Sequence, residues 1–149
     1  MTEESQNFKT HPIQLASLNV AELHIEPNVA PDKKTGVEGS EVTISSAYSE
    51  YDEEENLISV AVKAEVGMSG DSDSPPPFSM RVEVTGNFVV VDKERFPMDE
   101  IQHWAEFSAP MILFPYVREH VFSLTARCGF DPMILPLLEV PTVDAREES

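Results

Sequence analysis

FSMRVEVTGNFVVV, residues 78–91, alternates apolar and polar side chains with the period of two that is typical of a half-buried β-strand. Phe78 and Met80 fall on one side of such a strand, whereas Ser79 and Arg81 fall on the other. Because successive side chains of a strand point to opposite faces of the sheet, one face is predicted to be covered and the other solvated. The stretch therefore predicts one strand of an antiparallel sheet with a single buried face.

Three earlier segments repeat this alternation. They span residues 12–26, 41–50 and 56–68, and the residues between them are rich in proline, glycine and acidic side chains, which are typical of turns. Within the first segment the alternation loses phase near Leu18 and Val20, which predicts a bulge or a bend. Together with the later strand, these segments predict a four-stranded antiparallel meander.

The residues after the fourth strand are predicted to form helices that cover the apolar face of the sheet. MDEIQHWAEF (98–107) begins with acidic residues, which suit a helix N-terminus. In a helical conformation it brings Ile101, Trp104 and Ala105 to one side. This segment is expected to be a short helix packed on the sheet.

A longer helix is expected from Pro110 to about Arg127, with Gly129 as its C-terminal stop. Pro115 lies inside this span and lacks a backbone N–H, so we expect either a kink or a helix that begins later than the apolar run. Apolar residues occupy nearly the whole circumference of the first turns, which is more than one sheet can bury. We therefore predict an oligomer with an even number of subunits and with this helix at its interface.

The segment GFDPMILPLLEV (129–140) follows the long helix. Pro132 and Pro136 interrupt its apolar residues, so it is predicted to be extended and to form neither a helix nor a regular strand. We expect its apolar side chains to be available for binding.

Length and charge limit the possible functions. A chain of 149 residues suits one domain, which we place at residues 12–140 between flexible ends at 1–11 and 141–149. The formal net charge of −17 repels phosphate backbones and anionic lipids, so nucleic acids are not expected as partners. No apolar run is long enough to span a membrane, because prolines and charges interrupt the best candidate. A basic protein is the better-matched partner.

No catalytic or metal-binding motif is recognisable. The single cysteine, Cys128, cannot form an internal disulfide, and the N-terminus has neither the basic start nor the apolar core of a signal peptide, so we expect a cytoplasmic protein. His24, His103 and His120 do not have metal-site spacing with Cys128. We expect no cofactor and no enzymatic activity. Residues distant in sequence can converge in space, so an enzyme or small-ligand carrier stays the third functional alternative.

Two motifs resemble those of a known family. ILFPYVRE (112–119), followed by the proline-punctuated segment 129–140, is similar to the signature of the SecB family of export chaperones, and GNF (86–88) and EPN (26–28) also fit. The resemblance covers roughly residues 13–140. It implies an α+β fold in which a short helix and a long helix pack on one face of a four-stranded antiparallel sheet. It also implies a homotetramer, a dimer of dimers assembled through the long helices.

The family's activity implies an ATP-independent chaperone that holds unfolded polypeptides for export. Broad apolar grooves with adaptable methionine and aromatic walls suit such clients. As client-binding residues we predict Phe96, Trp104, Phe107, Met111, Phe114, Phe130, Met133, Leu135 and Leu137. Trp104 and Phe114 have a competing explanation as core residues against the sheet. As interface residues we predict Tyr116, Val117, His120, Val121 and Leu124.

The resemblance further implies that acidic residues on the sheet dock SecA, the motor ATPase of secretion. Two of these positions fall on Glu22 and Glu26, and Glu83 lies two residues from a third position, which is Arg81 in this sequence. We also do not expect VPTVDAREES (140–149) to form a counterpart of the family's C-terminal helix. The alternative function is therefore a SecB-like chaperone dedicated to one partner, such as the antitoxin of a stress-responsive toxin–antitoxin pair.

Overall fold

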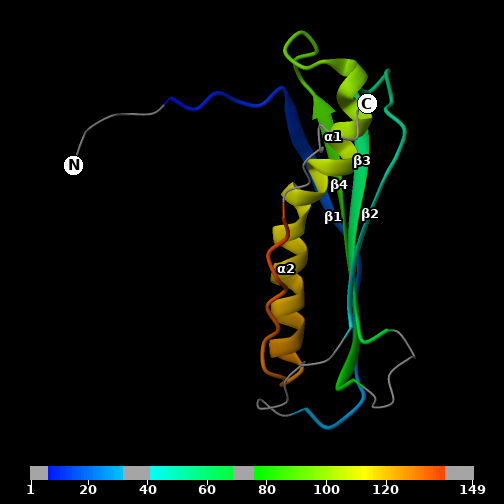
Figure 1. The fold of residues 1–149 in the computed structure, drawn as a ribbon, viewed down its shortest axis with the longest axis vertical. Helices are drawn as coiled ribbons and strands as arrows, with labels where there is room; N and C mark the ends of the chain where they lie inside the picture. The colour runs from blue at the N-terminus through cyan, green and yellow to red at the C-terminus, as the bar shows by residue number, and fades with distance from the viewer. Residues whose placement is uncertain (1–6, 32–40, 69–75, 140–149) are drawn as a thin grey trace, which may run out of the picture.

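The computed structural model describes residues 7–31, 41–68 and 76–139. Four strands form one sheet, and the helices lie on one face of it (Figure 1). In chain order the elements are β1 (Ile13–Pro27), β2 (Val42–Tyr48), β3 (Leu57–Val66), β4 (Phe78–Val90), the short 3₁₀ helix η1 (Met98–Glu100), α1 (Ile101–Phe107) and α2 (Ala109–Arg127). The predicted α+β fold is confirmed.

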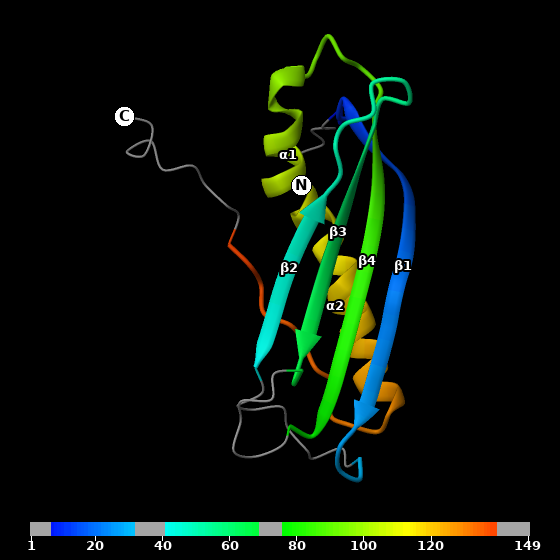
Figure 2. The ribbon, with the colours of Figure 1, turned by 90° about the vertical axis from the view of Figure 1, so that its right-hand side faces the viewer.

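The strand order in the sheet is β1-β4-β3-β2, and all neighbouring strands are antiparallel (Figure 2). The predicted meander is therefore wrong for β1, which lies beside β4 and not beside β2. Strand length gives a physical reason, because β1 has 15 residues and β4 has 13, whereas β2 has 7. Pairing the two long strands leaves fewer backbone groups without a hydrogen bond.

β1 contains two irregularities that keep its apolar side chains on the helix side. Its register against β4 shifts between Leu15 and Ser17 and again between Val20 and Glu22. Each extra residue reverses the alternation, so the disturbance predicted near Leu18 and Val20 is confirmed as two bulges. The residues opposite inward-facing positions of β4 are Ile13, Leu15, Leu18, Val20, Leu23 and Ile25.

The core lies between the sheet and the helices. Every second residue of β3 and β4 is buried, as the alternation predicts. Ile101, Trp104 and Ala105 of α1 are buried on the side that faces the sheet, also as predicted. The Trp104 ring packs edge-on against Phe88 of β4, with ring centroids 5.0 Å apart. The short helix is thus fixed to the sheet by its aromatic side chain.

α2 is continuous from Ala109 to Arg127 although it contains Pro115, so the predicted later start is wrong. Pro115 is exposed. Because Pro115 has no backbone N–H, it cannot donate the helical hydrogen bond to the carbonyl of Met111. The predicted stop is confirmed, since Gly129 has a φ of 89°, a left-handed conformation that glycine adopts without a Cβ penalty.

Residues 130–139, here called the crossover segment, form neither a helix nor a strand, as predicted. The segment runs antiparallel along α2 (Figure 1). Two hydrogen bonds hold it there. The Met133 N–H donates to Thr125 Oγ1 at 2.8 Å, and Arg118 Nε donates to the Leu135 carbonyl at 3.2 Å. These bonds fix which side chains of the segment turn toward the core.

Candidate functional site

The apolar residues predicted to bind clients separate into an accessible group and a buried group. Phe96, Phe107 and Met111 are partly exposed, and Leu137 is 81% exposed. The buried group comprises Trp104, Phe114, Phe130, Met133 and Leu135. The competing explanation of Trp104 and Phe114 as core residues is therefore the one that their burial supports.

The crossover segment presents different side chains from those predicted. Phe130 packs on Phe78 with ring centroids 4.9 Å apart, and Met133 and Leu135 also point into the core. Their predicted place on an accessible wall is wrong, because the two hydrogen bonds to α2 turn these side chains inward. Ile134 is 67% exposed and takes the outer position instead. The sequence of this segment did not show which of its apolar residues face the core and which face the solvent.

An apolar hollow of about 190 Å³ lies between β2, the junction of α1 with α2, and the end of the crossover segment. We call it the edge hollow. Phe107, Met111 and Phe114, which the sequence assigned to client binding, meet there. Its other lining residues are Ile44, Ser45, Ser46, Val62, Glu106, Pro110, Leu138 and Glu139. Flexible methionine and aromatic walls of this kind accommodate side chains of varied shape.

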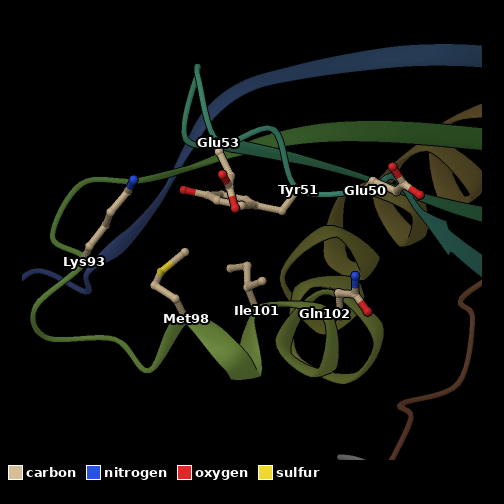
Figure 3. A pocket seen from close by; sticks show the side chains of 7 residues that line it. All are labelled: Glu50, Tyr51, Glu53, Lys93, Met98, Ile101 and Gln102. Carbon is tan, nitrogen blue, oxygen red and sulfur yellow. The ribbon is translucent and has the colours of Figure 1, made fainter.

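A larger hollow of about 630 Å³ lies at the end of the molecule where the β2–β3 turn meets η1 and α1. Figure 3 shows Met98 and Ile101 pointing from the helices toward Tyr51, with Lys93 across the opening. The remaining lining residues are Glu50, Glu53 and Gln102. An apolar floor with carboxylates at the rim suits a side chain that has an apolar stem and a positive end.

The sequence pattern does not predict this end hollow, because acidic residues between two strands are typical of a turn. The turn is ordered by Asp52, whose Oδ1 accepts hydrogen bonds from the N–H groups of Glu54 and Glu55. Tyr51 packs beneath the turn and donates a hydrogen bond to Asn56 Oδ1 at 3.2 Å. Burial raises the pKa of the Tyr51 hydroxyl, and the nearby acidic residues Glu53 and Asp52 raise it further.

The outer face of the sheet carries a cluster of charged residues. Arg81 Nη1 lies 3.5 Å from Glu22 Oε1 on β1, and Arg81 Nη2 lies 3.3 Å from Glu65 Oε2 on β3. Glu22 is thus ion-paired across the strands, whereas Glu26 and Glu83 form no ion pair with the described part of the chain. The three predicted docking residues do share one face of the sheet. Glu22 lies opposite Glu83, and Glu26 follows Glu22 by four residues with no register shift between them.

The carboxylate of Glu65 forms ion pairs with two positively charged side chains, Arg81 and Lys63. Partial burial would raise the pKa of its carboxyl, but hydrogen bonds from Arg81 and Lys63, together with their positive charges, outweigh that effect and hold the pKa below its usual value. Lys63 Nζ lies 3.4 Å from Glu65 Oε1. The sequence pattern does not predict this network, because Arg81 of β4 meets carboxylates of two other strands, Glu22 of β1 and Glu65 of β3.

The predicted interface residues do not form one surface. Val117 and Val121 are fully buried against the chain's own sheet, so their assignment to a subunit interface is wrong. They belong to the same helix stripe as the buried Leu113. Tyr116 is exposed, and His120 and Leu124 are half-buried. The large apolar side chains of α2 that are exposed are Ile112, Tyr116 and Phe122.

Within the described ranges, no group of three or more His, Cys, Asp or Glu side chains has the geometry to hold a metal ion. Cys128 is a free, half-buried thiol at the end of α2. None of the helices in the described part of the chain is long and apolar enough to cross a membrane.

Apolar hollows beside an edge strand are features of proteins that bind extended polypeptides. The family model of preprotein translocase subunit SecB matches residues 6–142, and the chain belongs to the SecB family.

Four of the curated relatives that match carry the name of this family, protein-export protein SecB. Protein-export protein SecB of Saccharophagus degradans is 32% identical over 121 residues, which cover 81% of this chain and 62% of that protein. The uncharacterized protein MJ0357 of Methanocaldococcus jannaschii is 33% identical over 95 residues, or 64% of this chain and 59% of that protein. The chain spans between 48% and 66% of the length of these and the other curated relatives it matches.

A solved structure has the same fold. It contains the SecB-like chaperone Rv1957 of Mycobacterium tuberculosis in complex with a ChAD peptide from the antitoxin HigA1, Rv1956. The TM-score is 0.67 at 19% identity, and the match covers 85% of this chain and 90% of that chain.

Proposed function

We propose that this protein is an ATP-independent chaperone that binds unfolded polypeptides and keeps them from aggregating before export. The observation that carries the proposal is the edge hollow, whose accessible floor combines Phe107 with Met111 beside an edge strand. Ile134 and Leu137 add exposed apolar surface on the crossover segment next to it. Membership of the SecB family supports the same function.

The proposed binding is energetically feasible. At roughly 25 cal/mol per Å², burying on the order of 400 Å² of apolar surface contributes about 10 kcal/mol before the entropy of ordering the client is subtracted. The formal net charge of −17 then keeps the loaded protein soluble. Binding of moderate affinity to many sequences follows, because the contacts are apolar and the walls adaptable.

We further propose that the protein acts in the cytoplasm as a homo-oligomer, with a dimer of dimers as the expected form. Ile112, Tyr116 and Phe122 of α2 are each 43% or 44% exposed in the single chain. Val20 and Leu23 of the edge strand β1 are exposed to a similar degree. Apolar groups of this size on neighbouring elements are typical of subunit interfaces.

The alternative proposal is a chaperone dedicated to one partner, for example an antitoxin, without docking to SecA. The charged face favours it, because Arg81 binds Glu22 and thereby reduces the negative charge available to a basic docking partner. Rv1957, which has the same fold, was solved with an antitoxin peptide.

One experiment tests the holding function. Several unrelated proteins are diluted from denaturant with and without the chaperone, and their aggregation is followed by light scattering. The wild-type protein should suppress aggregation of most of them, and Phe107→Asp should not. Val91→Asp places the same charge on an exposed apolar residue outside the edge hollow and should behave as wild type. Protection of a single partner only would favour the dedicated alternative, and protection of none would contradict both.

A further inference from the structure

Residues 7–11, here called the arm, leave the body of the molecule at the start of β1. Figure 1 shows the arm running out on the helix side of the sheet, away from the other elements. The base of the arm is fixed by hydrogen bonds. The Pro12 carbonyl accepts one from the Val91 N–H at 2.8 Å, and Arg95 Nη1 donates another to the Thr10 carbonyl at 3.2 Å. The arm therefore leaves the body in a defined direction.

The tip of the arm carries an aromatic ring beside a positive charge. Phe8 is 90% exposed, the largest fraction among the large apolar side chains of the described ranges. Lys9 is also exposed and forms no ion pair with the described residues. Aromatic side chains are enriched at protein interfaces, because one ring buries a large apolar area. The tip thus has the chemistry of a binding element.

The end hollow is complementary to this tip. Tyr51, Met98 and Ile101 form its apolar floor, and its volume of about 630 Å³ has room for a phenyl ring (Figure 3). The carboxylates of Glu50 and Glu53 at the rim form no ion pair with the part of the chain that the structure describes. Such carboxylates attract an apolar group that has a positive charge next to it. Apolar surface and charge therefore both match.

The wall of the end hollow is held in place by the chain's own hydrogen bonds. Asn56 closes the β2–β3 turn with a φ of 55°. Its carbonyl accepts a hydrogen bond from the Val90 N–H of β4 at 2.9 Å, and its side chain accepts one from the Tyr51 hydroxyl. Binding to a preformed wall costs little ordering entropy.

The geometry disfavours the end hollow of the same chain as the binding site of the arm. β1 and β2 are the opposite edges of the sheet, so three strand spacings, about 14 Å in total, separate the start of β1 from the edge that leads into the β2–β3 turn. Phe8 lies only two residues beyond the anchored Thr10, an extended span of about 7 Å. A second copy on the helix side of the sheet is better placed, and two-fold symmetry would make the exchange reciprocal.

We propose that the arm binds the end hollow of a neighbouring copy of this chain, with Phe8 on the apolar floor and Lys9 beside the carboxylates of the β2–β3 turn. Lys93 lies across the opening (Figure 3), so only one orientation of the arm brings unlike charges together. The inference rests on the proposed homo-oligomer and goes beyond the holding of clients. It gives the arm and the end hollow a role in assembly that is separate from that of α2.

Photo-cross-linking of the full chain tests this contact. With p-benzoylphenylalanine in place of Phe8, illumination should give a covalent dimer on a denaturing gel, and mass spectrometry should place the link on Met98 or another residue of the floor. Lys9→Glu should lower the yield about threefold or more, because it brings like charges together. Glu53→Lys, at an exposed position, should restore the yield when it is added to Lys9→Glu. A link confined to one chain, a dimer linked elsewhere, or no link overturns the proposal.

Subunit affinity gives an independent check. Phe8→Ala should raise the dissociation constant of the subunits about tenfold or more in sedimentation experiments, because it removes the buried ring. Asn7→Ala changes an exposed polar residue of the same arm and should keep the wild-type value. An oligomeric wild type whose dissociation constant is unchanged by Phe8→Ala would overturn the arm exchange and leave the proposed oligomer standing. A wild type that is a monomer at every concentration would contradict both.

Discussion

Arg81 Nη1 lies 3.5 Å from Glu22 Oε1, so the residue that departs from the acidic docking pattern is bound to one of the carboxylates of that pattern. The pair is about one third exposed on each side, and an exposed ion pair of this kind contributes little to stability. Its main effect is on the potential of the sheet's outer face, where it lowers the net negative charge next to Glu26 and Glu83.

The first prediction concerns docking to purified SecA. If the outer face docks it, wild-type binding should weaken as salt rises, and the double variant Glu22→Lys/Glu26→Lys should lose binding while keeping its fold. Arg81→Glu should strengthen binding, because it frees Glu22 and adds a carboxylate. Affinity can be measured by calorimetry at two salt concentrations. Absence of binding by both the wild type and Arg81→Glu would contradict docking and support a dedicated partner.

The second prediction concerns assembly. Ile112→Asp combined with Tyr116→Asp should lower the mass measured by light scattering, because each change places a charge in the proposed subunit interface. The fold should survive, since both side chains are already 43% exposed in the single chain. Val91→Asp, also at an exposed apolar position, is the matched control and should keep the wild-type mass. A wild-type mass of 16.6 kDa at micromolar concentration would show that the protein is a monomer and would contradict the proposed homo-oligomer.

The third prediction concerns acid stability. The pKa of Glu65 is lowered in the folded protein from its ordinary value of 4.5. A carboxyl with a depressed folded pKa contributes stability that is present above pH 4.5 and is lost as the pH falls through the folded pKa. When the pH is lowered from 6 to below 4.5, the free energy of unfolding should therefore fall less for Glu65→Gln than for the wild type. Urea unfolding at each pH measures this difference. An unchanged pH dependence would contradict a role for the Arg81 and Lys63 contacts.

Much of the fold could be predicted from the sequence, because it depends on local periodicity. The alternation in residues 57–66 and 78–90 matches the buried faces of β3 and β4, and Gly129 marks the end of α2. Strand order could not be obtained in this way, because the pairing of β1 with β4 is a long-range contact between strands matched in length. Gly86 illustrates the limit, since a Cβ there would lie 2.7 Å from Leu113 Cδ2, a close approach that only the assembled fold reveals.

The candidate site was predicted from residue type, because methionine and aromatic side chains suit adaptable apolar walls. Phe107, Met111 and Phe114 follow each other at helical spacing and meet at the edge hollow as a group. The crossover segment has no such period, so the choice between Met133 and Ile134 as the outer residue depended on hydrogen bonds to α2.

The last prediction contrasts two residues that the sequence placed together on an accessible wall. Phe107 is partly exposed at the edge hollow, so Phe107→Asp should cost less than about 1 kcal/mol of folding free energy, as surface changes do. Met133 is 7% exposed, and its amide bonds the fully buried Thr125. Met133→Asp should therefore cost about 3 kcal/mol or more, because it buries a charge without a partner. Urea unfolding at neutral pH measures both values, and Val82→Asp in the centre of the sheet provides the reference for a core position. If Phe107→Asp unfolds the protein as readily as Val82→Asp does, the edge hollow is part of the core and is not free to bind a client.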